Sequence, residues 1–247
     1  MAISVAQARL LSDRRFFVSM ALAMALATLV GFAPTYYFSA LNDAGPLAVS
    51  VHIHGALCTA WILLLIAQTC LIAAGRRDIH RMLGISGGAI AAAVLVSGIF
   101  VATHSHRRVH TATTADTLAD PYVFMIFPLT AVGLFAAFAV MGILNRHEPE
   151  AHKRLMLLAT ASLITPALAR IVNQAAQMGV VAVPGVVGAM VLINGFLAAI
   201  VIHDLVTRGR LHPVTLWGGG ILLLSEPLRF MIGFSAPWQA FARVLMN

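Results

Sequence analysis

Long, uninterrupted apolar runs constrain the fold of this chain more than any other feature. Seven segments are each long enough to cross the roughly 30 Å hydrocarbon core of a bilayer as a helix, at about 1.5 Å per residue. None of them alternates polar and apolar residues as a transmembrane β-strand does. The predicted spans are 16–38, 48–73, 82–103, 121–144, 154–177, 184–206 and 213–235.

The composition excludes an ordinary soluble domain. Of the 247 residues 60% are hydrophobic and 10% are charged, whereas soluble domains have roughly 45–50% and about 25%. Within lipid every backbone polar group must be satisfied internally, which a helix achieves alone. We therefore predict a single all-α integral membrane domain over residues 1–247, with the lipid bilayer as its solvent.

Basic residues are distributed unevenly between the two ends of the predicted bundle. The net charge of +7 comes mostly from short loops beside spans, which is typical of membrane topology and argues against nucleic acid as a partner. Because lysine and arginine concentrate in cytoplasmic loops, we expect a cytoplasmic N-terminus and an external C-terminus, in a bacterial cytoplasmic (inner) membrane. The inner set is Arg9, Arg14, Arg15, Arg76, Arg77, Arg81, Arg146, Lys153, Arg154, Arg208 and Arg210, and the outer set is Arg107, Arg108 and Arg243.

Histidines recur at the inner ends of the predicted spans. HRMLG begins at His80, HKRLM at His152 and HPVTLW at His212, and His203 lies at the inner end of the sixth span. His80 and His152 lie in first helical turns, where the helix dipole disfavours the imidazolium ion, and the neutral ring is the form that ligates metals and haem iron. These histidines are therefore candidate cofactor ligands; the alternative is that they anchor the helices at the membrane interface.

Charged residues inside the fifth and seventh spans predict a second polar site, in the outer half of the bundle. Arg170, Glu226 and Arg229 lie roughly 20–24 Å along their helices from the inner face. A charge within a span costs at least about 2.5–3.5 kcal/mol, so it should face the interior and have a partner. We expect Arg170 to pair with Glu226, which leaves Arg229, with Asn173 and His54 nearby, for an anion, a haem propionate or a quinone carbonyl. The alternative is a structural clamp between two helices.

The motif HRMLG, followed about 70 residues later by HKRLM and then by Arg170, resembles the motifs of a family of predicted bacterial multi-pass membrane proteins of unknown function. The resemblance covers residues 48–178. That family looks distantly like the b-type di-haem transmembrane reductases, in which pairs of histidines hold haems between alternate helices. The resemblance implies His80 and His152 as the axial ligands of one haem b near the inner face, with His54 as a candidate ligand on the outer side.

Three functions remain open from the sequence. The first is a membrane oxidoreductase or electron-transfer protein that exchanges electrons between a haem b or metal and a quinone or small reductant. The second is a non-haem oxygenase with iron or copper bound by the inner histidines: His80, His152, His203 and His212. The third is a transporter, assembly factor or accessory subunit of a larger membrane complex, with no cofactor and with structural or anion-binding arginines.

Overall fold

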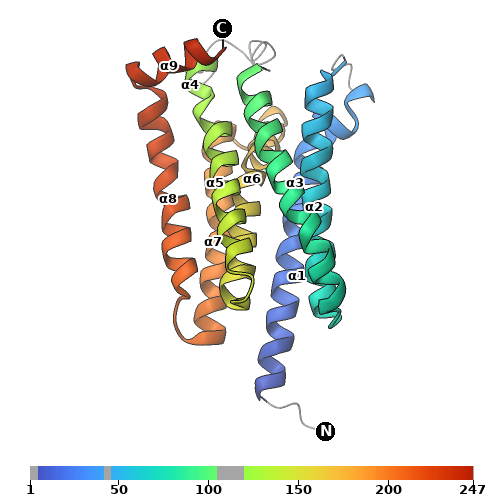
Figure 1. The fold of residues 1–247 in the computed structure, drawn as a ribbon. Helices are drawn as coiled ribbons and strands as arrows, with labels where there is room; N and C mark the ends of the chain where they lie inside the picture. The colour runs from blue at the N-terminus through green and yellow to red at the C-terminus, as the bar shows by residue number, and fades with distance from the viewer. Residues whose placement is uncertain (1–4, 42–45, 105–119, 247) are drawn as a thin grey trace.

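The structure, a computed structural model, describes residues 5–41, 46–104 and 120–246, and the regular elements in these ranges are all helical. The long helices run side by side as a bundle, with the two termini at opposite ends and α9 lying across the end near the C-terminus (Figure 1). The elements are α1 (Val5–Phe32), η1 (Ala33–Tyr37), η2 (Ser39–Leu41), α2 (Val49–Ala73), α3 (Arg77–His104), α4 (Pro121–Phe124), α5 (Ile126–Leu144), α6 (Pro149–Gln177), α7 (Gly185–Arg208), α8 (Pro213–Gly233) and α9 (Ala236–Met246).

Local sequence signals set the helix boundaries in the second half of the chain. Pro121, Pro149 and Pro213 occupy the first positions of α4, α6 and α8, where a missing amide hydrogen leaves no bond unmade. The Asp120 carboxylate caps α4 by accepting a backbone N–H at 2.8 Å. Gly209 ends α7 with φ 70°, a conformation that glycine adopts without steric cost.

Helix α6 is the centre of the bundle and packs against α1, α5, α7 and α8. Beside this group, α2 packs against α1 and α3, and α3 packs against α5. A helix that is buried on most of its circumference belongs to the core, not to a surface. The buried residues of α6 are Arg154, Leu155, Leu157, Leu158, Ala159, Thr160, Ala161, Ser162, Ile164, Ala167, Leu168 and Val172.

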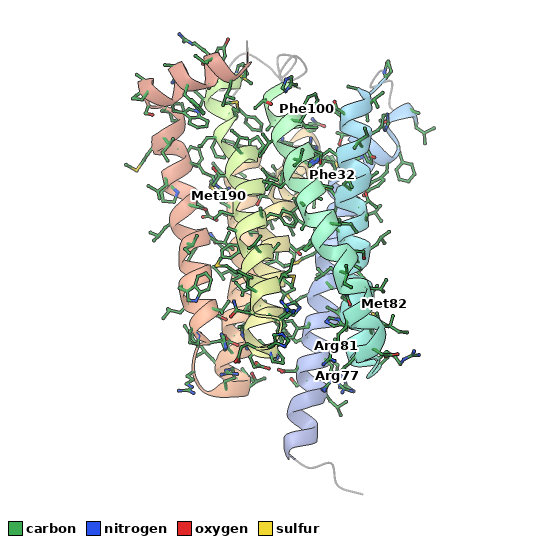
Figure 2. All side chains as sticks on the ribbon, viewed as in Figure 1. Phe32, Arg77, Arg81, Met82, Phe100 and Met190 are labelled. Carbon is green, nitrogen blue, oxygen red and sulfur yellow. The ribbon has the colours of Figure 1, made fainter. Side chains whose placement is uncertain are left out.

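The outer faces of the bundle are covered with large, exposed apolar side chains. In water such a continuous apolar surface would be unfavourable, whereas lipid tails solvate it. Figure 2 shows side chains projecting outward along the whole length of the bundle, with Arg77 and Arg81 near the end where the N-terminus lies. Examples of the exposed apolar residues are Leu26, Leu63, Ile85, Val96, Val206 and Leu224.

Six of the seven predicted spans have both the length and the composition to cross a membrane. The seventh, α8, is 21 residues long and packs against α5, α6 and α7. Its hydropathy is lower because it contains Glu226, Arg229 and three consecutive glycines. The crossing of α8 and the orientation of the termini stay predictions, and Arg107 and Arg108 lie outside the described residues. Helices α3 and α6 begin earlier than expected, so that His80 and His152 lie within their first turns or just after them.

We predict that Gly31→Ala destabilises the bundle. A Cβ atom at Gly31 would collide with the backbone carbonyl group of Ala167, where α1 crosses α6. Backbone cannot yield as a flexible side chain does, so we expect the free energy of unfolding to fall by roughly 1–3 kcal/mol. Thermal unfolding in detergent measures the change. The matched control is Gly133→Ala on α5, where a Cβ meets nothing within 4 Å; equal unfolding midpoints in the two variants would contradict the prediction.

Candidate functional site

The rings of His80 and His152 lie next to each other between α3 and α6. Their centroids are 6.2 Å apart and the ring planes are nearly perpendicular, at 86°. The Nδ1 atom of His152 lies 2.8 Å from the carbonyl oxygen of Gly142 on α5. Because a carbonyl only accepts, Nδ1 carries the hydrogen, and Nε2 of the neutral ring keeps a free lone pair. This carbonyl–imidazole contact is the arrangement commonly found behind metal-ligating histidines.

Gln68 of α2 completes the surroundings of His80. Its Nε2 atom donates a hydrogen bond of 3.1 Å to the carbonyl oxygen of His80. Gln68 Oε1 and His80 Nδ1 are both buried, and within the described part of the chain neither has a hydrogen-bond partner. A buried polar atom left without a partner costs about 1–3 kcal/mol, so this is where a ligand or an ordered water is expected. Gln68 was not predicted as a site residue, although it is a lone amide in an apolar run.

His203, the third predicted inner ligand, has partners of its own. Its Nε2 atom lies 2.9 Å from Oδ1 of Asp13 on α1. Its ring stacks on Phe16, with centroids 3.9 Å apart and planes within 11°. These contacts join α7 to α1, so the ring helps to hold the first helix against the bundle.

His212 caps the N-terminus of α8. Its Nδ1 atom accepts a hydrogen bond of 3.1 Å from the backbone N–H of Val214, which requires that nitrogen to be unprotonated. Burial and the charge of Arg154 lower the pKa of His212, which favours the neutral ring. Among the residues that the structure describes, no three His, Cys, Asp or Glu side chains are grouped to hold a metal ion.

A buried ion pair dominates the inner end of α6 and α7. The guanidinium of Arg154, 1% exposed, donates through Nε and Nη2 to Oδ1 of the fully buried Asp204. Asp204 Oδ2 accepts further hydrogen bonds from the Thr215 hydroxyl at 2.6 Å and from the backbone N–H of His212 at 3.0 Å. Arg154 was predicted only as one of the inner basic residues that indicate topology. Its partner could not be predicted because it lies 50 residues away in the chain.

Glu150 extends this ion pair toward the surface. Its carboxylate accepts hydrogen bonds from Arg154 and from Lys153, at 2.8 Å and 2.6 Å, and from Arg208 at 3.1 Å. Lys153 also binds Asp13 at 2.6 Å. Asp13 of α1 and the charged groups of Glu150, Lys153, Arg154, Asp204 and Arg208 on α6 and α7 therefore compensate one another, and these contacts hold the three helices together.

The outer half of the bundle is organised differently from our prediction. The expected Arg170–Glu226 ion pair is absent from the described residues. Arg170 lies over the ring of Phe32, 4.4 Å from its centroid, and donates to the carbonyl oxygen of Pro166. Phe32 is labelled in Figure 2. Arg170 faces α1 and Glu226 faces α7, because rotation of each helix about its axis, and not only depth, decides which side chains meet.

Glu226 and Arg229 lie one helical turn apart on α8, in the outer half of the bundle. Glu226 Oε2 accepts a hydrogen bond of 3.1 Å from Asn194 on α7, and Arg229 Nη2 donates to the Ser225 hydroxyl at 3.1 Å. Asn194 was not predicted, although it is a lone amide in the apolar run VLINGFL. Glu226 Oε1 and Arg229 Nε are the other two buried polar atoms without a partner in the described part of the chain.

Asn173 and His54 lie against other neighbours. The Oδ1 atom of Asn173 packs close to Gly185 at the start of α7. His54 Nδ1 shares a hydrogen bond of 3.0 Å with the Ser97 hydroxyl of α3, and the Cys58 sulfur lies 3.5 Å from Nε2. No hydrogen bond or ion pair of the described residues links either side chain to Glu226 or Arg229.

The comparisons with known proteins do not add a family to this geometry. No family model, no curated protein and no solved structure matches the chain. A function for this chain is therefore inferred from its own residues and their geometry.

We predict that Asp204→Asn destabilises the protein strongly. The substitution leaves the Arg154 charge buried without its main counter-ion, and removal of one partner from a buried pair costs about 3–5 kcal/mol. Thermal unfolding of the purified protein in detergent measures the loss. Asp78→Asn is the matched control, because it removes an exposed Arg–Asp pair with Arg76 and should leave the midpoint unchanged. Similar midpoints for the two variants would show that the inner ion pair does not hold the bundle together.

Proposed function

We propose that this chain is a membrane-embedded electron-transfer protein that binds a b-type haem through His80 and His152. The single observation that supports the proposal is the 6.2 Å separation of the two ring centroids. Two imidazole rings this close could both ligate one metal atom, since an imidazole nitrogen ligates a metal at about 2 Å. The two histidines are 72 positions apart in the chain, so the tertiary packing of α3 against its neighbours sets this separation.

The donor set and its surroundings fit such a cofactor. Both ligands are imidazoles, which haem iron accepts as axial ligands, and the partnerless Nδ1 atom of His80 is buried beside them. On α3, Cβ atoms added at Gly84 or Gly88 would meet their nearest neighbours only at 3.8 Å. These glycines leave the helix face near His80 without side-chain bulk. A bound haem would supply one-electron chemistry at a potential set by its ligands and their hydrogen bonds.

The chain's own residues orient the ligands. The Gly142 carbonyl holds the hydrogen of His152 on Nδ1 and thereby directs the lone pair of Nε2 away from α5. Gln68 is held in place by its bond to the His80 carbonyl oxygen, and its free Oε1 atom is an acceptor available for the Nδ1–H of His80. With its hydrogen on Nδ1, His80 would present Nε2 as the ligand atom, as His152 does.

The proposal includes the predicted topology in a bacterial cytoplasmic membrane. It is supported by the six apolar helices, by the length of α8 and by the termini at opposite ends of the bundle (Figure 1). An odd number of crossings places the two termini on opposite sides. With the inner arginines cytoplasmic, His80 and His152 lie near the cytoplasmic face.

We expect the C-terminus to be external. Alkaline phosphatase fused after residue 247 should therefore be active in a bacterial host, and green fluorescent protein fused at the same position should be dark. The same two reporters fused after Arg146, in the loop before α6, serve as the internal control and should give the reverse pattern. A bright fluorescent protein at the C-terminus would mean that α8 does not cross.

We predict that His80→Ala and His152→Ala each abolish haem binding while the protein still inserts in the membrane. Absorption spectra of the detergent-purified protein, oxidised and dithionite-reduced, should show a reduced b-type α-band at about one haem per chain in the unmodified protein. Metal analysis of the same samples identifies iron or copper bound without haem. His52→Ala is the matched control, because that ring packs against Tyr36 at the other end of the bundle.

The outcomes separate the candidate functions. Full cofactor retention in both variants would remove His80 and His152 as ligands. Iron or copper without a haem band would favour the non-haem oxygenase, and a colourless, metal-free protein would favour a transporter or an accessory subunit.

A further inference from the structure

The outer half of α8 carries two charged side chains that form no ion pair with each other. Glu226 and Arg229 are one helical turn apart, and Arg229 is only 4% exposed. Side chains at this spacing are neighbours on a helix surface, yet no ion pair forms between them. Each binds a neutral partner: Glu226 the amide of Asn194, and Arg229 the hydroxyl of Ser225.

Each of the two charged groups also keeps one buried atom unused. Glu226 Oε1 is a hydrogen-bond acceptor without a donor, and Arg229 Nε is a donor without an acceptor. An apolar interior offers no bulk water to complete them, so both atoms are expensive to leave bare. The inner end of the bundle shows the contrast, since every oxygen of Asp204 there has a donor.

A hydroxyl group lying between the two atoms would satisfy both, because its oxygen would accept from Arg229 Nε–H while its hydrogen was donated to Glu226 Oε1. A carboxylate ligand would satisfy Arg229 and repel Glu226. Val191, Leu224 and Leu228, each within three residues of Asn194, Glu226 or Arg229 in the chain, are exposed on α7 and α8, so exposed apolar surface begins close to these residues. The ligand should therefore be soluble in lipid and carry a hydroxyl head group.

We propose that Glu226 and Arg229, with Asn194 on α7, form a binding site for a lipid-soluble quinol. A quinol brings the required hydroxyl on a flat, lipid-soluble ring. The corresponding quinone has carbonyl oxygens only, so it can accept from Arg229 but leaves Glu226 Oε1 bare. The site thus binds the reduced form in preference to the oxidised form. The role of this quinol as an electron donor rests on the proposed function; its binding does not.

The test measures binding of decylubiquinol and decylubiquinone, under anaerobic conditions, to the full chain in quinone-free lipid nanodiscs, with empty nanodiscs as the blank. The unmodified protein should bind the quinol about tenfold more tightly than the quinone, because one buried acceptor is left bare with the quinone. In Glu226→Gln the side-chain amide donates as well as accepts, so the preference should shrink to about equal affinity. Arg229→Lys should weaken both ligands, since the guanidinium Nε–H is lost.

Glu148→Gln is the matched control, because it makes the same chemical change on an exposed residue at the opposite end of the bundle, and it should bind like the unmodified protein. Equal affinities for quinol and quinone in the unmodified protein, or an unchanged preference in Glu226→Gln, would overturn the proposal. Displacement of the quinol by an equal concentration of dodecanoic acid, together with no preference for quinol over quinone, would assign the site to fatty acids. That result would also overturn the proposal.

The same titration of His152→Ala separates this proposal from the haem proposal. Selective quinol binding without a haem band in any sample would keep the outer site and remove the redox function. A haem band without quinol binding would do the reverse.

Discussion

Every polar group inside this bundle must find its partner within the protein, because the helices turn apolar faces to their surroundings and to one another. That constraint explains the inner end of the molecule. The carboxylate of Asp204 takes donors from α6, from α8 and from the loop before α8, and Arg154 divides its donors between Asp204 and Glu150. A compensated set of this kind holds α6, α7 and α8 in one arrangement, and it leaves few atoms free for chemistry.

The same constraint makes the exceptions informative. Four buried side-chain atoms of the described residues have no partner, and they occur as two pairs, Gln68 with His80 and Glu226 with Arg229. Each pair offers atoms that could hydrogen-bond to a bound ligand, and the ring of His80 could also ligate a metal. The first pair lies beside His152 at the inner end, and the second lies in the outer half, near exposed apolar residues of α7 and α8. Two sites at two depths would suit a protein that takes electrons from a lipid-soluble carrier on one side and holds a haem nearer the other.

Helix α6 connects these features. It carries Arg154 of the ion pair, His152 of the inner site and Arg170 of the outer half, and it packs against four other long helices. Its polar residues are therefore held by tightly packed neighbours. Close approach at small residues, such as Gly31 against Ala167 and Gly142 against Met156, keeps α1 and α5 near α6. The carbonyl of Gly142 can reach His152 because of that proximity.

The sequence by itself determined the helical class, the approximate positions of the long apolar helices and the distance of each polar residue along its helix, since apolar run length and a rise of about 1.5 Å per residue are local properties. It also singled out His80 and His152, which the structure brings together. Only the tertiary structure decided the partners. Arg170 contacts Phe32 and not Glu226, and His203 contacts Asp13. Gln68 and Asn194, which were not predicted, hydrogen-bond to His80 and to Glu226. The reason is physical: two residues at one depth meet only when both helices are rotated toward each other, and that rotation depends on the packing of all the helices together.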